Sequence, residues 1–125
     1  MDSLPILGVI ALTLGVGLLL LLVTSEPKRV DSPERATRER RVEHYRRGLE
    51  LGDKAEWRKA ITEFDRVIDL DPNHGAAYTQ RGFAYAELGK TDKAIADFEN
   101  ALSRTRDPKA IAYIEAEIKQ LREGK

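Results

Sequence analysis

The sequence contains no cysteine and only two histidines. Without cysteine the chain forms no disulfide, offers no thiolate to a metal ion and has no cysteine nucleophile, although the redox compartment stays open. An excess of one charge is also missing, because 21 Lys and Arg balance 21 Asp and Glu. That balance provides no broad basic surface of the kind that binds nucleic acid. The composition therefore excludes thiol chemistry and gives no indication of a nucleic-acid partner.

Charge is nearly absent from residues 1–25, where Asp2 is the only charged side chain. Residues 4–23 are uncharged, and a helix of that length spans about 30 Å, the thickness of the hydrocarbon core of a bilayer. A cleaved signal peptide is the alternative, but no Lys or Arg precedes the apolar run and no small-x-small cleavage site follows it. Residues 1–25 are therefore predicted to be an uncleaved transmembrane anchor with its span at 4–23.

Small residues recur at helical spacing within this predicted span, at Gly8, Ala11 and Gly15. A face of this kind lets transmembrane helices approach one another closely, which makes it a candidate helix-packing face for a partner. The alternative is that these residues have no partner, because small residues are frequent in membrane spans in general.

All 21 basic residues follow Glu26. Because positively charged flanks stay on the cytoplasmic side, this pattern predicts a single-pass membrane protein with its N-terminus outside and its body on the cytoplasmic, stromal or matrix side. Residues 26–40 are interpreted as a basic linker that leads into a first helix starting near Pro33. Candidates for contact with anionic lipid headgroups are Lys28, Arg29, Arg35 and Arg38. A solvated helix face is the alternative, and the interleaved acidic residues favour it.

The rest of the chain repeats itself with a period of 34 residues. Residues 59–64 read KAITEF, residues 93–98 read KAIADF, and Gly48 matches Gly82 at the same interval. A fixed period of this length indicates a repeat architecture. In each copy, two segments with apolar residues three or four positions apart flank a turn, which predicts a pair of helices. The expected helices are 41–51 and 56–70 in the first copy, and 75–88 and 91–103 in the second. Pro72 is expected to end the helix before it at Asp71, Gly89 to end the third helix as a left-handed C-cap, and Thr91 to cap the fourth.

The repeated residues resemble the tetratricopeptide repeat (TPR) family. The family's small residue, alanine and aromatic residue have counterparts in both copies: Gly48, Ala60 and Phe64, then Gly82, Ala94 and Phe98. Gly48 and Gly82 are expected to let the first helix of each hairpin lie close on the second. The resemblance implies an all-α fold, in which the predicted transmembrane helix is followed by a short solenoid of stacked helical hairpins. It places TPR 1 at 41–74, TPR 2 at 75–108 and a C-terminal capping helix at 109–125, with Asp107 as its N-cap and Pro108 in its first turn.

No pattern of an enzyme occurs in the sequence, since the P-loop, the G-x-S-x-G turn and the dinucleotide fingerprint are all missing. His44 and His74 lack the histidine or cysteine companions of a metal site. His44 is expected to pack in place of an aromatic ring, and His74 to lie solvated in a turn. The carboxylates have no base or nucleophile beside them. The sequence predicts a non-catalytic protein without cofactor, metal or small-molecule substrate.

Binding in this family takes place on the concave surface lined by the first helix of each hairpin. The resemblance places a partner-binding groove there, formed by Tyr45, Leu49, Asp53, Thr79, Phe83 and Glu87. Tyr45, Leu49 and Phe83 make an apolar strip between acids, which suits a helix or an extended peptide. The alternative is that the chain's own first or C-terminal helix covers the strip. The family's clamp for chaperone C-termini is not matched.

The resemblance implies a membrane-anchored adaptor that binds protein partners through the groove and through the anchor. The first alternative is a small accessory subunit or assembly factor of a large membrane complex, because an anchor followed by TPRs is similar to proteins that assist photosystem I assembly. The second alternative is an anionic-lipid surface binder that uses residues 35–41.

Overall fold

A computed structural model describes residues 32–124 of the chain. Over this range the chain is all-α, as predicted, with five helices and no strand: α2 (Pro33–Asp53), α3 (Trp57–Leu70), α4 (Gly75–Glu87), α5 (Thr91–Leu102) and α6 (Pro108–Arg122). The predicted anchor lies outside the described residues. So do the residues predicted for its packing face and part of the predicted lipid contact, namely Gly8, Ala11, Gly15, Lys28 and Arg29.

The predicted membrane topology needs correction. Within residues 32–124, none of the helices combines the length and the apolar character needed to cross a membrane. The longest of them, α2, has 21 residues but is dense in Arg and Glu. This finding contradicts the predicted localisation as a single-pass membrane protein with its N-terminus outside, so we assign no membrane location. The span on which that prediction depended, residues 4–23, lies outside the described part of the chain.

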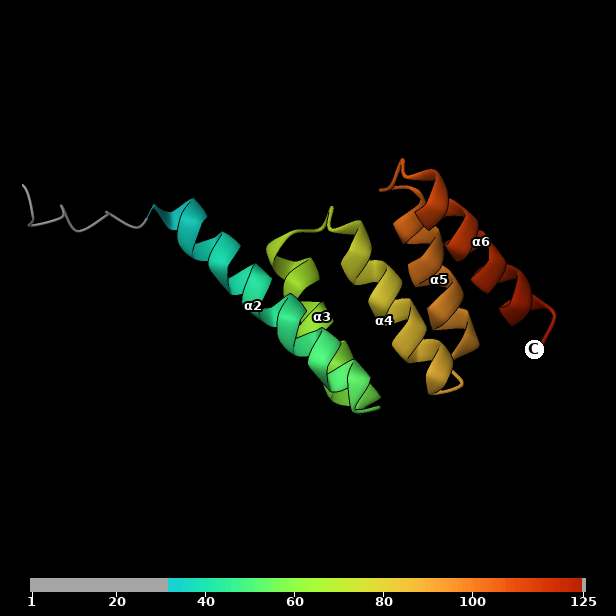
Figure 1. Cartoon of the computed structure of the whole chain (residues 1–125). Helices are drawn as coiled ribbons and strands as arrows, with labels where there is room; N and C mark the ends of the chain where they lie inside the picture. Colours follow the sequence, from blue (N-terminus) through green and yellow to red (C-terminus); the bar gives the residue numbers. More distant parts are fainter. Residues whose placement is uncertain (1–31, 125) are drawn as a thin grey trace, which may run out of the picture. The chain divides into compact units, whose positions relative to one another are not determined.

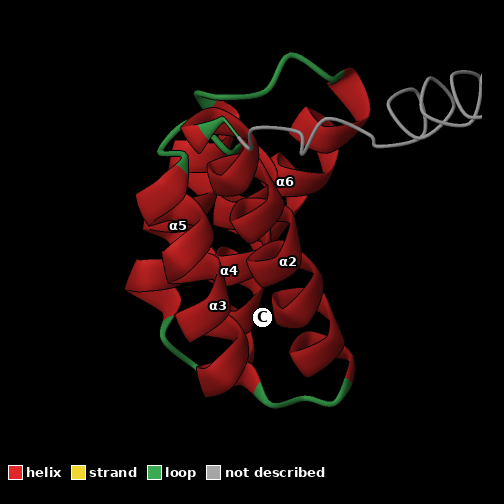
Figure 2. Ribbon diagram, turned by 90° about the vertical axis from the view of Figure 1, so that its left-hand side faces the viewer, coloured by secondary structure: helices red, strands yellow, loops and turns green. Residues whose placement is uncertain are grey.

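The described helices stack in chain order (Figure 1). Each of α2, α3, α4 and α5 packs against the helix that follows it, and α2 also contacts α4. Short loops join the helices, as the view in Figure 2 shows. The helices therefore form two hairpins, α2–α3 and α4–α5, with α6 packed on the second. Because the first helices of the two hairpins touch, α2 and α4 share one side of the stack.

Local sequence signals explain where several helices begin and end. Asp107 precedes α6, and its Oδ1 accepts a hydrogen bond from the Lys109 N–H at 3.1 Å, as an N-cap does. Gly89 follows α4 with φ 72°, a left-handed conformation that glycine adopts without steric cost. At the end of α3, Asp71 is extended because it precedes Pro72. These predicted boundaries are confirmed.

The N-caps of two other helices differ from the predictions. Thr91 was expected to cap α5, but it is the first helical residue, and Lys90 before it makes no side-chain cap. His74, expected to be solvated in its turn, is half-buried and caps α4, because its Nδ1 accepts a hydrogen bond from the Ala77 N–H at 3.1 Å. Histidine is not among the usual N-cap residues, so its sequence position alone did not indicate this role.

The core consists of the seams where helices meet. In α3 and α5 the alanine and the phenylalanine that the repeated stretches share are buried: Ala60 and Ala94 are 0% exposed, Phe64 is 2% and Phe98 0% exposed. A Cβ added to Gly48 would lie 2.5 Å from the Phe64 ring, and one added to Gly82 would lie 3.1 Å from the Phe98 ring. The two glycines therefore allow the first helix of each hairpin to lie close on the second, as predicted.

The end of the stack is covered by α6. Its apolar residues Ile114 and Ile118 are buried and belong to the same core cluster as Phe98 and Ala101 of α5. This arrangement agrees with the C-terminal capping helix that the repeat pattern implies, because a terminal helix of this kind covers the last apolar face of an array.

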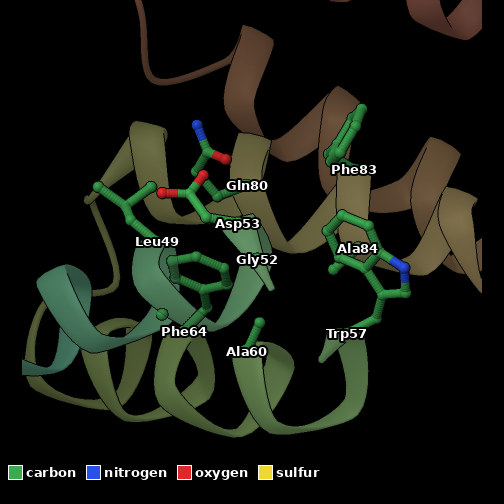
Figure 3. A pocket seen from close by; sticks show the side chains of 10 residues that line it. Leu49, Gly52, Asp53, Trp57, Ala60, Phe64, Gln80, Phe83 and Ala84 are labelled. Atoms are coloured by element: carbon green, nitrogen blue, oxygen red, sulfur yellow. The ribbon is translucent and has the colours of Figure 1, made fainter. Parts of the chain in front are cut away.

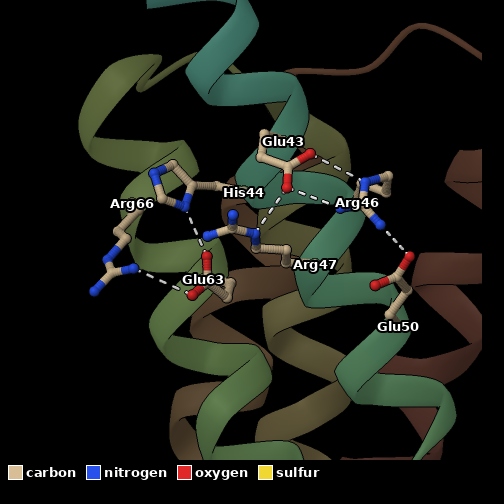
Figure 4. A network of polar contacts seen from close by, with 7 residues as sticks. All are labelled: Glu43, His44, Arg46, Arg47, Glu50, Glu63 and Arg66. Atoms are coloured by element: carbon tan, nitrogen blue, oxygen red, sulfur yellow. Dashed lines mark hydrogen bonds and ion pairs between the residues drawn. The ribbon is translucent and has the colours of Figure 1, made fainter.

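At the other end of the described stack, the exposed side of α2 carries a network of ion pairs (Figure 4). Glu43 accepts hydrogen bonds from Arg46 at 2.8 Å and from Arg47 at 2.8 Å, and Arg46 also pairs with Glu50. These pairs lie one turn apart along the same helix. The surface they form is polar, which suits a solvated end of the stack.

Candidate partner-binding groove

A cavity of about 240 Å³ opens between α2, α3 and α4, and we call it the aromatic groove (Figure 3). Side chains of all three helices line it: Gly48, Leu49, Gly52 and Asp53 from α2, Trp57, Ala60 and Phe64 from α3, and Gln80, Phe83 and Ala84 from α4. The C-terminal helix α6 is not among these elements, because it packs on α5. The groove therefore depends on the stacking of the two hairpins.

The apolar end of the groove is formed by Trp57 and Phe83. Their rings meet edge to face, with 5.6 Å between the centroids and 74° between the planes. Both side chains are half-buried, and both line the cavity. Phe64 and Ala60, which are almost fully buried, also line it (Figure 3). Edge-to-face packing stabilises the two rings in this geometry.

The polar end of the groove is formed by Asp53 and Gln80, which lie beside Leu49 and away from the aromatic pair (Figure 3). Asp53 is the last residue of α2 and is exposed. It is also the only charged side chain among the lining residues. Between residues 32 and 124, Asp53 has no ion-pair partner. The groove thus combines an apolar wall with a single unpaired carboxylate.

Three of the six predicted groove residues line the cavity, namely Leu49, Asp53 and Phe83. The other three lie elsewhere. Tyr45 packs its ring on Phe64, at 6.0 Å between centroids, and on the His74 ring, at 5.1 Å. Burial raises the pKa of the Tyr45 phenol above its ordinary value.

The other two predicted residues, Thr79 and Glu87, are not among the residues that line the cavity. The Thr79 hydroxyl donates a hydrogen bond to the Gly75 carbonyl of its own helix at 3.2 Å. Glu87 is exposed as the last residue of α4, and neither residue lines the groove. The observed groove is therefore smaller than the predicted one, and it shares Leu49, Asp53 and Phe83 with it.

Trp57 is one of the groove residues that the sequence interpretation missed, and it forms half of the aromatic pair. It stands at the start of α3, the second helix of its hairpin, whereas the family resemblance directs attention to the first helices. The period of 34 residues pairs Trp57 with Thr91, so the repeat itself gave no signal. One signal for a binding role was present in the sequence: Trp57 is the single tryptophan of the chain, and no core position was predicted for it.

The described part of the predicted lipid contact lies at the start of α2. Arg35 is exposed and its Nε donates a hydrogen bond to Glu39 at 2.9 Å, one turn further along the helix. Arg38 is exposed as well. Contacts of this kind are typical of a solvated helix face.

His44, which was predicted to pack in place of an aromatic ring, is half-buried and makes a polar contact. Its Nδ1 lies 2.7 Å from Glu63 Oε2, so it joins α2 to α3 through a polar contact (Figure 4). Glu63 also pairs with Arg66 at 3.2 Å. Over residues 32–124, no group of histidines and carboxylates is placed to hold a metal ion.

A half-buried cluster holds α4, which carries Phe83, against its neighbours. The Arg81 guanidinium donates two hydrogen bonds of 2.8 Å to Asp97 of α5 and one of 2.7 Å to Asp65 of α3. These hydrogen bonds, those from Asp97 first, raise the pKa of Arg81 further above its already high ordinary value. The cluster joins both hairpins and so positions the groove.

Two stacked helical hairpins, closed by a terminal helix and sealed by small residues packed on phenylalanines, define a helical repeat protein. Residues 75–105, which span α4 and α5, match the tetratricopeptide repeat family. The chain is also 30% identical over 60 residues to the uncharacterized protein MJ0572 of Methanocaldococcus jannaschii. That match covers 48% of this chain and 70% of the archaeal protein. The second hairpin of the chain is therefore similar to a tetratricopeptide repeat.

Proposed function

We propose that the protein is a non-catalytic adaptor that binds a segment of a partner protein in the aromatic groove. The observation that carries this proposal is the position of Trp57 and Phe83, which are only half-buried and line an open cavity. Aromatic side chains in such positions anchor a partner because they bury a large apolar area on binding. Tetratricopeptide repeats bind protein partners, which agrees with this role.

The size of the groove also supports a peptide segment as its occupant. At about 240 Å³ it is smaller than the roughly 300–1,000 Å³ of a typical small-molecule pocket. A cavity of this size takes one or two side chains of a helix or an extended peptide, while the rest of the partner lies on the surfaces of α2 and α4. No cofactor is needed for such a role.

Gly52 offers a way to block the groove without removing a core group. A Cβ at Gly52 would lie 3.7 Å from the Trp57 ring, an ordinary van der Waals contact, so a Cβ fits there without a clash. We expect Gly52→Leu to fill the groove and abolish recovery of partner proteins in a pull-down analysed by mass spectrometry. Circular dichroism should show the helical content of the parent chain.

Ala112→Leu is the matched control, because Ala112 is exposed on α6, which does not line the groove. This variant adds the same side chain and should recover the same partners as the parent chain. Equal recovery by Gly52→Leu would show that the groove is not the binding site. Native gel electrophoresis then separates two forms of the adaptor role: co-migration with one large complex indicates an accessory subunit, and transient association with intermediates indicates an assembly factor.

A further inference from the structure

We infer that the partner segment carries a basic side chain beside a large apolar side chain, and that Asp53 pairs with this cation. This inference rests on the proposed function, which supplies the groove and the peptide, and it adds the charge of the occupant. The apolar side chain packs at the Trp57–Phe83 end, and the lysine or arginine lies at the Asp53–Gln80 end.

The unpaired carboxylate of Asp53 is the first argument. A partner seated in the groove removes water from Asp53, and burying a carboxylate without a counter-charge is costly. Over residues 32–124 the chain supplies no such counter-charge to Asp53. Lys54 follows directly in the turn but does not line the groove. A neutral or acidic occupant would therefore be disfavoured, and a basic occupant would supply the missing partner.

Helix ends provide the second argument. The C-terminal end of a helix carries partial negative charge, which favours a nearby cation. The two helices α2 and α4 have no basic residue in their last turns, and they end in Asp53 and Glu87. This part of the stack is thus suited to a positively charged ligand.

The composition of the groove wall provides the third argument. Lysine and arginine have apolar stems that pack on aromatic surfaces while the charged group stays at the polar rim. Indole and phenyl rings also attract cations through their faces, and tryptophan does so most strongly. Trp57 and Phe83 supply such surfaces, and Gln80 supplies an amide at the same rim as Asp53. The wall therefore accepts both the apolar side chain and the stem of its basic neighbour.

The probe for this inference is a phage-displayed library of random dodecapeptides, selected on the full chain. We expect the selected peptides to be enriched in lysine or arginine next to an aromatic or large aliphatic residue. Synthetic versions without tryptophan are then titrated against the protein. Because Trp57 is the only tryptophan of the chain, a change in its emission reports occupancy of the groove directly.

The carboxylate is tested with Asp53→Asn, which keeps the shape of the side chain and removes its charge. The dissociation constant for the selected basic peptides should rise about two- to five-fold, since Asp53 is exposed in the free chain. Added salt should weaken binding to the parent chain more than binding to the variant. Asp53→Lys should reject these peptides more strongly and select acidic ones.

Glu87→Gln is the matched control, because Glu87 holds the corresponding place in the second repeat and does not line the groove. This variant should bind the basic peptides as the parent chain does. An equal loss in Glu87→Gln and Asp53→Asn would overturn the inference, since it would point to the net charge of the chain instead of a local pair.

Two further outcomes separate the inference from the proposed function. In the first, the selected peptides lack basic residues, bind Asp53→Asn as well as the parent chain and do not bind Gly52→Leu. This result would overturn the inference that the occupant is basic and leave the groove as the binding site. A selection in which no enriched peptide depends on Gly52 would overturn both. Basic peptides that lose affinity in Asp53→Asn and in Gly52→Leu support both.

Discussion

The hairpins α2–α3 and α4–α5 carry an arginine at the same place in the repeat but use it differently. In the second hairpin, Arg81 joins Asp97 of its own hairpin to Asp65 of the preceding one. In the first hairpin, the corresponding Arg47 donates to Glu43 on its own helix, and both are part of an exposed network. Among the described helices none precedes α2, so Arg47 has no second helix to join. The arginine at this repeat position therefore links helices inside the stack, as Arg81, and forms a surface ion pair at the end of the described stack, as Arg47.

The acidic residue that pairs with Arg81 also has a counterpart in the first hairpin with different contacts. Asp97 is 4% exposed and is held by Arg81, whereas its counterpart Glu63 is held by His44 and Arg66. His44 stands where the second copy has Tyr78, so the polar contact between α2 and α3 comes from a different position on the helix. Equivalent sequence positions therefore do not guarantee equivalent contacts.

The largest expected effect tests the link inside the stack. Asp97→Ala leaves the half-buried Arg81 without its main partner, and removing one member of a buried charge pair costs about 3 kcal/mol. Arg47→Ala should leave the free energy of unfolding nearly unchanged, because its pair is exposed and screened by solvent. Urea denaturation of both variants measures the contrast. Equal losses would mean that the two hairpins use this arginine alike.

The next largest loss of stability is expected where Gly48 packs on Phe64 and Gly82 packs on Phe98. Gly48→Ala places a Cβ 2.5 Å from the Phe64 ring, which is 2% exposed and has little room to move. Gly82→Ala places a Cβ 3.1 Å from the Phe98 ring, a contact that a small shift relieves. Overpacking should lower the free energy of unfolding by about 2 kcal/mol in the first variant and about 1 kcal/mol in the second. The reverse order in thermal unfolding would refute the tighter seam in the first hairpin.

The turns of the two hairpins give the third contrast. Ala55 has φ 56°, and its counterpart Gly89 has φ 72° with nothing within 4 Å of its would-be Cβ. Because alanine is strained at positive φ, Ala55→Gly should stabilise the protein by up to about 1 kcal/mol, raising Tm by about 4 °C. Gly89→Ala should cost about as much. A lower Tm for Ala55→Gly would show that the chain is not strained at this turn.

The smallest effect concerns Tyr45, which Thr79 replaces in the second repeat. Burial raises the pKa of Tyr45 in the folded chain, so folding favours the neutral phenol. Its contribution to stability is complete below about pH 10, the ordinary tyrosine pKa, and is lost as the pH rises through the higher folded value.

Tyr45→Phe should therefore lose less stability than the parent chain between neutral pH and about pH 10.5. Urea denaturation at several pH values measures the difference. Tyr85 and Tyr113, whose pKa values are also raised by burial, remain in both proteins and cancel in the comparison. An identical pH dependence of the two proteins would contradict a buried Tyr45 phenol.

Much of the fold was determined by the sequence alone, because the signals involved are local. The period of 34 residues and the apolar spacing placed the helices, Asp107 and Gly89 placed two of their ends, and Gly48 predicted that the helices of the first hairpin approach closely. Each of these signals involves a residue type with one strong preference, for a cap, for positive φ or for close approach.

Which residues form the aromatic groove could be seen only in the tertiary structure. Trp57 reaches the groove because α3 begins beside α4, and Asp53 is left unpaired because no basic side chain of α3 or α4 reaches it. His74 caps a helix, and Arg81 finds partners 16 residues away on both sides. These contacts depend on how three helices stack. A repeat pattern encodes which faces are buried, but side chains that differ between the copies meet only after the hairpins have packed.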